Sequence, residues 1–249
     1  MHPSHLRIKP SLEVAPKPAS MVHSGVFARA SHDAPHCLFA PLHYEPGYAY
    51  PLIVWLHGAG DDETQLLRIM PLLSLRNYVA IAPRGLREPL ADGAEGPCSW
   101  PMHARGVETA AQRVGEAVEL VALRYHVSRR GVFLAGFHAG GTMALRLAML
   151  QPDRFAGVLS LCGGLPRGGA LLSNLDQARS LPVFLASGRL SADYPASAVC
   201  QDLRLLHAAG FETTLREYPC GQQITARMLS DMDRWIIEQF TARKSSRPT

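Results

Sequence analysis

A short glycine-rich segment in the middle of the chain is the first place where chemistry could be done. Residues 136–141 have the sequence Gly-Phe-His-Ala-Gly-Gly, and they follow an apolar run at 132–135. The glycine spacing matches the Gly-x-Ser-x-Gly turn, in which a tight bend from strand to helix presents a central nucleophile above a sheet. Here the central residue is His138. An imidazole cannot replace an activated serine hydroxyl without a different mechanism.

The segments that must position this turn alternate between strand-like and helix-like patterns. Most of the strand-like runs are apolar on both faces, as a sheet covered by helices on both sides requires. We therefore expect an α/β fold with a doubly wound, mainly parallel sheet and helices on both faces. The predicted strands are 52–56, 78–82, 132–135, 157–161, 183–186 and 213–218, with a further antiparallel pair at 27–30 and 37–43. The predicted helices are 62–74, 107–125, 139–151, 196–209 and 224–240.

Four separate stretches carry a family resemblance. They are residues 51–61, 136–143, 182–188 and 217–221. In this order they resemble the oxyanion loop, the nucleophile turn, the strand before the acid and the histidine loop of one group of esterases. The chain is thus similar, over most of 50–240, to the phospholipase/carboxylesterase branch of the α/β-hydrolase superfamily, close to dienelactone-hydrolase-like esterases. The resemblance implies the α/β-hydrolase fold.

The resemblance also implies where a catalytic triad would lie, and all three positions carry a different residue. The nucleophile position is His138. The acid position is Ser191, a register supported by Pro195, which falls where the family has a proline. The base position is Gln222, and glutamine has no proton to exchange near neutral pH. We expect that these three residues do not work together as a triad.

The anion-binding part of such a site is expected to persist. The family stabilises an oxyanion with two backbone N–H groups, which here would belong to Ala59 and Ala139. Backbone donors survive any change of side chain, so a pocket that accepts an anion is predicted at this place. The sequence shows no sign of a metal, nucleotide or haem site, and no cofactor is expected.

Several interpretations of the three triad-equivalent residues stay open. His138 is either an imidazole that binds a ligand or takes part in catalysis, or a filler that hydrogen-bonds Gln222 and blocks the site. Ser191 and His138 could also form a permuted dyad, with the serine as nucleophile and the histidine as base. Asp193 lies two residues from the acid position and could turn into it.

Other residues that could do chemistry have simpler interpretations. His57 belongs to the pair that shapes the oxyanion loop and is expected to be structural. The acidic run 61–63 is expected to begin a helix rather than to bind a metal. Cys162 and Cys220 have no identifiable partner base. Trp100, in the long loop 84–106, is expected to line the pocket, to act as a lid or to pack internally.

Composition and charge limit the remaining possibilities. The 249 residues are 47% hydrophobic and 18% charged with a net charge of +4, which is ordinary for one soluble globular domain. We expect a flexible arm at 1–24, a domain at 25–243 and a tail at 244–249. Neither a secretory signal, a membrane span nor a basic stripe for nucleic acid is recognisable. Five scattered cysteines favour a reducing cytoplasm.

Three functions are consistent with these patterns. The first is an esterase-like protein without serine-hydrolase activity that binds a small acyl or carboxylate ligand or a protein partner. The second is an active carboxylic-ester hydrolase with a non-standard site that depends on His138. The third is a structural subunit that pairs with an active paralogue. The oligomeric state is left open.

Overall fold

The computed structural model describes residues 27–29, 35–90, 93–168 and 175–245. The expected arm at 1–24 lies outside the described residues, as do residues 246–249 of the expected tail. The division into arm, domain and tail therefore stays a prediction.

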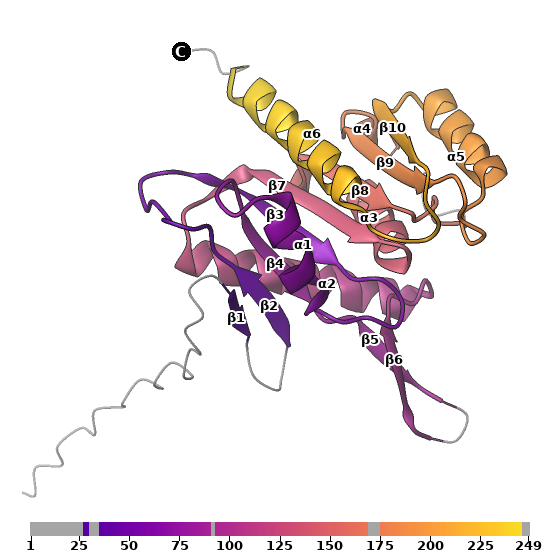
Figure 1. Cartoon of the computed structure of the whole chain (residues 1–249), viewed down its shortest axis with the longest axis horizontal. Coiled ribbons are helices and arrows are strands. Elements are labelled where there is room, and N and C mark those ends of the chain that lie inside the picture. Colours follow the sequence, from indigo (N-terminus) through magenta and orange to yellow (C-terminus); the bar gives the residue numbers. More distant parts are fainter. Residues whose placement is uncertain (1–26, 30–34, 91–92, 169–174, 246–249) are drawn as a thin grey trace, which may run out of the picture.

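Eight strands form one sheet with a parallel centre (Figure 1). Their order across the sheet is β1-β2-β4-β3-β7-β8-β9-β10. All neighbours from β4 to β10 pair in parallel, whereas β2 pairs antiparallel with both β1 and β4. The predicted doubly wound sheet and the antiparallel front pair are thus confirmed. The strands are β1 Phe27–Arg29, β2 His36–Phe39, β3 Tyr50–Leu56, β4 Val79–Pro83, β7 Val127–Phe137, β8 Gly157–Leu161, β9 Val183–Gly188 and β10 Thr213–Tyr218.

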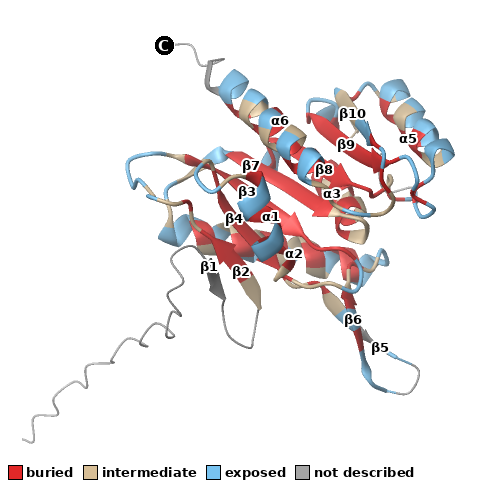
Figure 2. Cartoon of the chain, viewed as in Figure 1, coloured by how far each residue is buried: buried red, intermediate tan, exposed pale blue. Residues whose placement is uncertain are grey.

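Helices cover both faces of the sheet and create two hydrophobic cores. Helices α2 and α3 pack on one face, and α1 and α6 pack on the other. Successive strand residues point to opposite faces, so each central strand contributes to both cores. Strands β3, β4, β8 and β9 are buried along their length, whereas β7 is buried only from Gly131 to Gly136 (Figure 2). The helices are α1 Gln65–Leu73, α2 Ala104–Arg124, α3 Ala139–Leu150, α4 Leu175–Ala178, α5 Ala196–Ala208 and α6 Ala226–Ser245, with a 3₁₀ turn, η1, at Pro152–Arg154.

The parallel centre decides where a site can form. Strands β3, β7 and β8 end at Leu56, Phe137 and Leu161, and these ends lie at one edge of the sheet because the strands run the same way. In open α/β sheets, ligands bind in the crevice outside the carboxyl ends of the strands. This edge holds the predicted nucleophile turn and oxyanion loop.

The segment predicted as a long loop at 84–106 contains structure that the pattern did not reveal. Strands β5 Leu86–Pro89 and β6 Glu95–Ser99 form a separate antiparallel hairpin that projects from the body (Figure 1). Strand β6 contains Gly96 and Pro97, which are depleted in strands, so propensity favoured a loop. The alternation of exposed and buried residues along β6 shows that tertiary contact overrides this preference.

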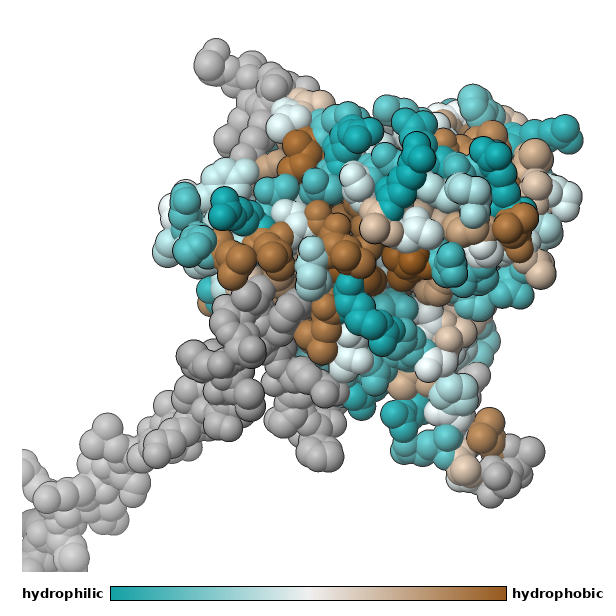
Figure 3. Space-filling view, in the orientation of Figure 1, coloured by the Kyte–Doolittle hydropathy of each residue, from teal (hydrophilic) through white to brown (hydrophobic). Residues whose placement is uncertain are grey.

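Helix α6 also differs from its prediction, because it continues to Ser245 instead of ending near 240. The buried side chain of Phe240 holds its last turns against the sheet. None of the helices in the described part of the chain is long and apolar enough to cross a membrane. On the face in Figure 3, exposed apolar side chains form several separate groups among polar ones.

Candidate functional site

The predicted turn between β7 and α3 has the expected geometry. His138 sits at its apex with φ 50° and ψ −118°, a strained conformation for a residue with a side chain. A Cβ atom on Gly136 would lie 2.5 Å from the Gly140 backbone, and a Cβ on Gly140 would lie 2.2 Å from the Leu56 carbonyl oxygen. Both glycines are therefore required by close backbone approach. This is the bend that presents a side chain above a sheet.

The His138 imidazole has no hydrogen-bond partner among the described residues. Its ring is half-buried and lies 6.2 Å from the Phe137 ring, between centroids. The backbone is held firmly, since the His138 N–H donates to the Leu161 carbonyl at 2.9 Å and its carbonyl accepts from the Thr142 N–H at 3.0 Å. The hydrogen bond expected between His138 and Gln222 is not formed. The polar atoms of Gln222 are occupied by other groups.

Ser191 and Gln222 lie in direct contact, as predicted acid and base positions should. The Ser191 Oγ donates to the Gln222 Oε1 at 2.5 Å and accepts from the Tyr194 N–H at 3.0 Å. The Gln222 Nε2 donates to the Cys162 carbonyl at 2.8 Å. Asp193 is exposed, so the contact with Gln222 belongs to Ser191. The pair is neutral and hydrogen-bonded, with no ionisable group in it.

The two predicted oxyanion donors are free. Within the described parts of the chain, neither the Ala59 N–H nor the Ala139 N–H has an acceptor. Ala139 is the first residue of α3, so its N–H also benefits from the positive end of the helix dipole. The close approach of Gly140 to the carbonyl oxygens of Leu56 and His57 places the oxyanion loop directly beside the turn. An anion at this position would meet unpaired donors rather than compete for them.

His57 is structural, as expected, because its ring nitrogens are already used. Nδ1 donates to the Gly58 carbonyl, and Nε2 accepts from the Gly85 N–H, each at 2.8 Å. The ring is fully buried, and this burial lowers the pKa of His57. A neutral imidazole with its proton on Nδ1 fits both bonds. Trp100 is also buried and donates to the His57 carbonyl at 2.9 Å, so it packs internally and is not a lid.

Comparisons with known proteins agree with this geometry. Residues 46–239 match the model of the family described as Phospholipase/Carboxylesterase. The chain belongs to this family. It is 23% identical over 207 residues to a probable carboxylesterase of Oryza sativa subsp. japonica, covering 76% of this chain and 78% of the relative.

Solved structures show the same α/β-hydrolase fold. The crystal structure of Arabidopsis thaliana SOBER1 superposes with a TM-score of 0.67 at 23% identity, covering 77% of this chain and all of that one. The Bacillus cereus carboxylesterase superposes with a TM-score of 0.63 at 18% identity, covering 83% and 95%. At these identities the likeness concerns the fold, and the activity of this phospholipase/carboxylesterase family member must be argued from its own residues.

The acidic run beside the oxyanion loop is engaged in local contacts. Helix α1 begins at Gln65, so residues 61–63 precede it and do not occupy its first turn, contrary to expectation. Asp62 accepts from the backbone N–H two residues on, an Asx-type turn that delays the helix. Burial works to raise the pKa of Glu63, but the two hydrogen bonds from Arg84, each 2.6 Å, lower the pKa together with a backbone hydrogen bond and the charge of Arg84. No cluster of three metal-ligating side chains occurs among the residues the structure describes.

The cysteines near the site are poor nucleophiles. Burial raises the pKa of Cys162 to about 11 and also raises the pKa of Cys220. Both thiols are therefore protonated near neutral pH, and a thiol is much less nucleophilic than a thiolate. Cys162 contributes through its backbone instead. Its φ of 55° is unusual for a residue with a side chain, and its carbonyl accepts from Gln222.

Asp202 supports the Ser191 side of the site and was missed by sequence reasoning. This fully buried residue of α5 accepts from the Leu165 N–H at 2.7 Å and from the Tyr194 hydroxyl at 3.0 Å, and it pairs with Arg167 at 3.1 Å. Tyr194 in turn donates its backbone N–H to Ser191. The sequence contains a signal for this residue. Asp202 is a charged residue on the buried stripe of α5, between the apolar residues Val199 and Leu206.

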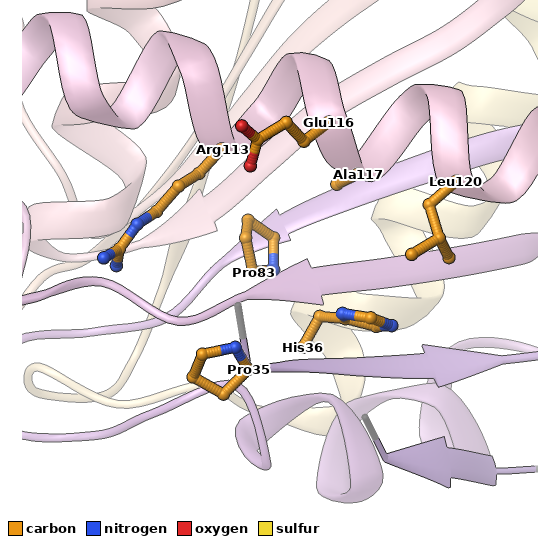
Figure 4. Close-up of a pocket in the computed structure, with 7 residues that line it drawn as sticks. All are labelled: Pro35, His36, Pro83, Arg113, Glu116, Ala117 and Leu120. Carbon is orange, nitrogen blue, oxygen red and sulfur yellow. The ribbon is translucent and has the colours of Figure 1, made fainter. Parts of the chain in front are cut away.

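Two cavities near these elements differ in what they could hold. A pocket of about 90 Å³ lies between α2 and the strands β2 and β4 (Figure 4). It is too small for most ligands, because small-molecule pockets measure about 300–1,000 Å³. A cavity of about 360 Å³ lies between Gly60 and the β5–β6 hairpin, with Arg87 and Glu95 in its wall. The second cavity borders the oxyanion loop and has room for a small polar ligand.

Proposed function

We propose that this member of the phospholipase/carboxylesterase family binds a small acyl or carboxylate ligand at the turn between β7 and α3, without working as a serine carboxylesterase. In this proposal His138, Ser191 and Gln222 occupy the nucleophile, acid and base positions. The observation that carries it is the hydrogen bond from the Ser191 Oγ to the Gln222 Oε1. A hydroxyl that donates to an amide has no base to take its proton.

The three triad-equivalent residues lack the groups that serine-hydrolase catalysis requires. Acyl transfer by a serine hydrolase needs a hydroxyl at the turn, a base to deprotonate it and a carboxylate to orient that base. His138 supplies no hydroxyl, Gln222 cannot accept a proton near neutral pH, and Ser191 carries no charge. The permuted dyad has no support either, because the buried Ser191 Oγ is committed to Gln222 and Tyr194.

Ligand binding is supported by what the site retains. The free N–H groups of Ala59 and Ala139 would donate to one carboxylate oxygen, as they would to the oxyanion of an ester intermediate. His138 directly precedes Ala139, and its imidazole has no hydrogen-bond partner among the described residues, so it would be available to donate a further hydrogen bond. A protein partner could present a carboxylate side chain or chain end to the same groups, so the chemistry of recognition is shared.

The proposal is tested by measuring binding and turnover together. Carboxylates from acetate to octanoate are titrated into the protein by calorimetry, and hydrolysis of the matching aryl esters is followed by absorbance. We expect saturable binding, no labelling by a fluorophosphonate, and no ester turnover above that of His138→Ala. Labelling by the fluorophosphonate or serine-dependent turnover would contradict the proposal. Absence of carboxylate binding would contradict the proposal that the site binds such a ligand.

A second candidate is ester hydrolysis that depends on His138. The observation that favours it is the absence of a hydrogen-bond partner for the imidazole among the described residues, beside two unpaired N–H donors. A neutral imidazole can attack an activated ester or assist a water molecule. Turnover that disappears in both His138→Ala and His138→Phe would establish this function, since the phenylalanine keeps a ring of similar size but has no nitrogen.

A further inference from the structure

A second polar cavity lies at the opposite end of the sheet from the candidate site. It measures about 320 Å³ and is lined by four arginines, Arg129, Arg130, Arg154 and Arg243. Arg129 and Arg130 belong to the beginning of β7, whereas the candidate site follows the end of that strand. The cavity is therefore separate from the oxyanion donors.

A bulge in β7 presents two of these arginines. Tyr50 of β3 pairs with Val127 of β7, and Leu52 pairs with Val132. Two steps along β3 thus correspond to five along β7, so three extra residues are accommodated between the paired positions. Bulges of this kind bend a strand and redirect its side chains. Arg129 and Arg130 fall within the bulge and are exposed.

The other two arginines are brought to the bulge by packing. A Cβ atom on Gly131 would lie 2.6 Å from the ring of Phe240, so α6 docks directly on the bulge where a side chain is missing. Arg243 lies three residues after Phe240, which is about one helical turn along the same side of α6. The Ala156 N–H donates to the Val132 carbonyl at 2.6 Å, and this bond holds the turn that carries Arg154.

The charge of this cavity is poorly compensated. Four arginine residues and one acidic residue, Asp153, line it, so the formal charge of the lining residues is +3 (four minus one). Arg154 donates to the Gln151 side chain at 2.8 Å. Within the described ranges, none of the four arginines forms an ion pair. Burial lowers the pKa of Arg243, and the carboxylate of Glu212 opposes this effect. Gathering like charges is unfavourable unless an anion joins them.

We propose that this arginine cavity binds a phosphate-bearing ligand, either a soluble phosphomonoester or diphosphate or the phosphomonoester headgroup of a lipid. Guanidinium groups recognise phosphate through paired N–H donors, and a phosphate monoester carries a charge of about −1.5 to −2 at pH 7. A monocarboxylate would neutralise only one of the three net charges. The volume lies near the lower end of small-molecule pockets, which favours a compact ligand.

The test uses the full chain and two probes. Pyrophosphate is titrated by calorimetry at low ionic strength, and vesicles with and without phosphatidic acid are used in a flotation assay. We expect at least one probe to bind, and we expect Arg129→Gln/Arg130→Gln to weaken that binding by about tenfold or more, since two charge-assisted contacts are removed. Binding of pyrophosphate identifies a soluble ligand, and binding of vesicles alone identifies a lipid headgroup.

Two further variants keep the test decisive. Arg105→Gln/Arg204→Gln removes the same charge from exposed positions on α2 and α5, outside the cavity, and should leave binding within about twofold, as expected for remote surface charges. Arg243→Gln reaches the cavity from α6 and should weaken binding without touching the bulge. The proposal is overturned if neither probe binds, or if the remote pair weakens binding as much as the bulge pair does.

Discussion

The two halves of the candidate site are built in different ways. The oxyanion half consists of backbone: the Ala59 and Ala139 N–H groups lie on segments that pack closely at Gly140, and the buried His57 ring binds the first of these segments to Gly85. The opposite half consists of side chains, with Ser191 hydrogen-bonded to Gln222. The backbone donors of the first half remain whatever side chains surround them. The second half keeps the contact between two loops but contains no group that ionises near neutral pH.

This difference shows which part of a site a sequence can change without losing the fold. Backbone donors depend on the close packing of glycines, so changing them disturbs the sheet itself. The Ser191–Gln222 pair closes the site with two neutral groups whose bonds are satisfied, and such a pair is compatible with burial. The side chains of the second half can therefore change while the fold and the backbone donors of the first half persist.

The largest effect is expected from Gly140→Ala in the oxyanion half. The added methyl group would lie 2.2 Å from the Leu56 carbonyl oxygen, and backbone atoms cannot yield as a flexible side chain can. We expect a loss of about 3 kcal/mol or more in the free energy of unfolding, measured by urea denaturation. Gly47→Ala is the matched control, because a Cβ there meets nothing within 4 Å. Equal stability of the two variants would show that the oxyanion half is not rigidly packed.

Restoring a catalytic triad tests whether the two halves of the site are still aligned with each other. The variant His138→Ser/Ser191→Asp/Gln222→His places a hydroxyl, a carboxylate and an imidazole on the existing backbone. We expect aryl-ester turnover to rise by about 10² or more over the parent chain, since a positioned general base contributes 10²–10⁴. The same variant with His138→Ala is the control and should show no such gain. A correctly folded but inactive triple variant would mean that the two halves are not aligned for catalysis.

A smaller effect is expected from Gln222→Ala in the side-chain half. This change leaves the buried Ser191 hydroxyl and the Cys162 carbonyl without their partner. Unpaired buried groups cost about 1–3 kcal/mol, so the midpoint of urea unfolding should fall accordingly. Gln223→Ala, at an exposed neighbour, should change stability by less than about 0.5 kcal/mol. If both variants behave alike, Gln222 does not hold the two loops together.

The smallest effect concerns the pH dependence of the oxyanion half. Burial lowers the pKa of His57 below its usual value of 6.5, so the unfolded chain binds a proton more readily than the folded chain. The contribution of a neutral His57 is fully present above pH 6.5 and is lost as pH falls, by at most about 1.4 kcal/mol per pH unit. We expect His57→Asn to flatten this dependence between pH 6.5 and 5. His207→Gln, at an exposed histidine, should retain it.

Patterns of neighbouring residues were enough to predict the local features of this protein. The apolar runs predicted the sheet, the glycine spacing located the bend at His138, and Pro195 supported the register that places Ser191 opposite Gln222. These features depend on backbone sterics and on the periodicity of neighbouring residues, which a linear pattern records.

The groups that meet across long separations in the chain could be identified only from the folded structure. The fold places Ser191 in contact with Gln222 and buries Asp202 against Tyr194. It leaves the His138 imidazole without a hydrogen-bond partner among the described residues. It also joined a bulge of β7 to the end of α6 around four arginines. Contacts of this kind depend on how whole helices dock on the sheet, and the β5–β6 hairpin shows that such docking can override local preference. The hydrogen bond between Ser191 and Gln222 and the arginine cavity therefore became visible only once the chain was folded.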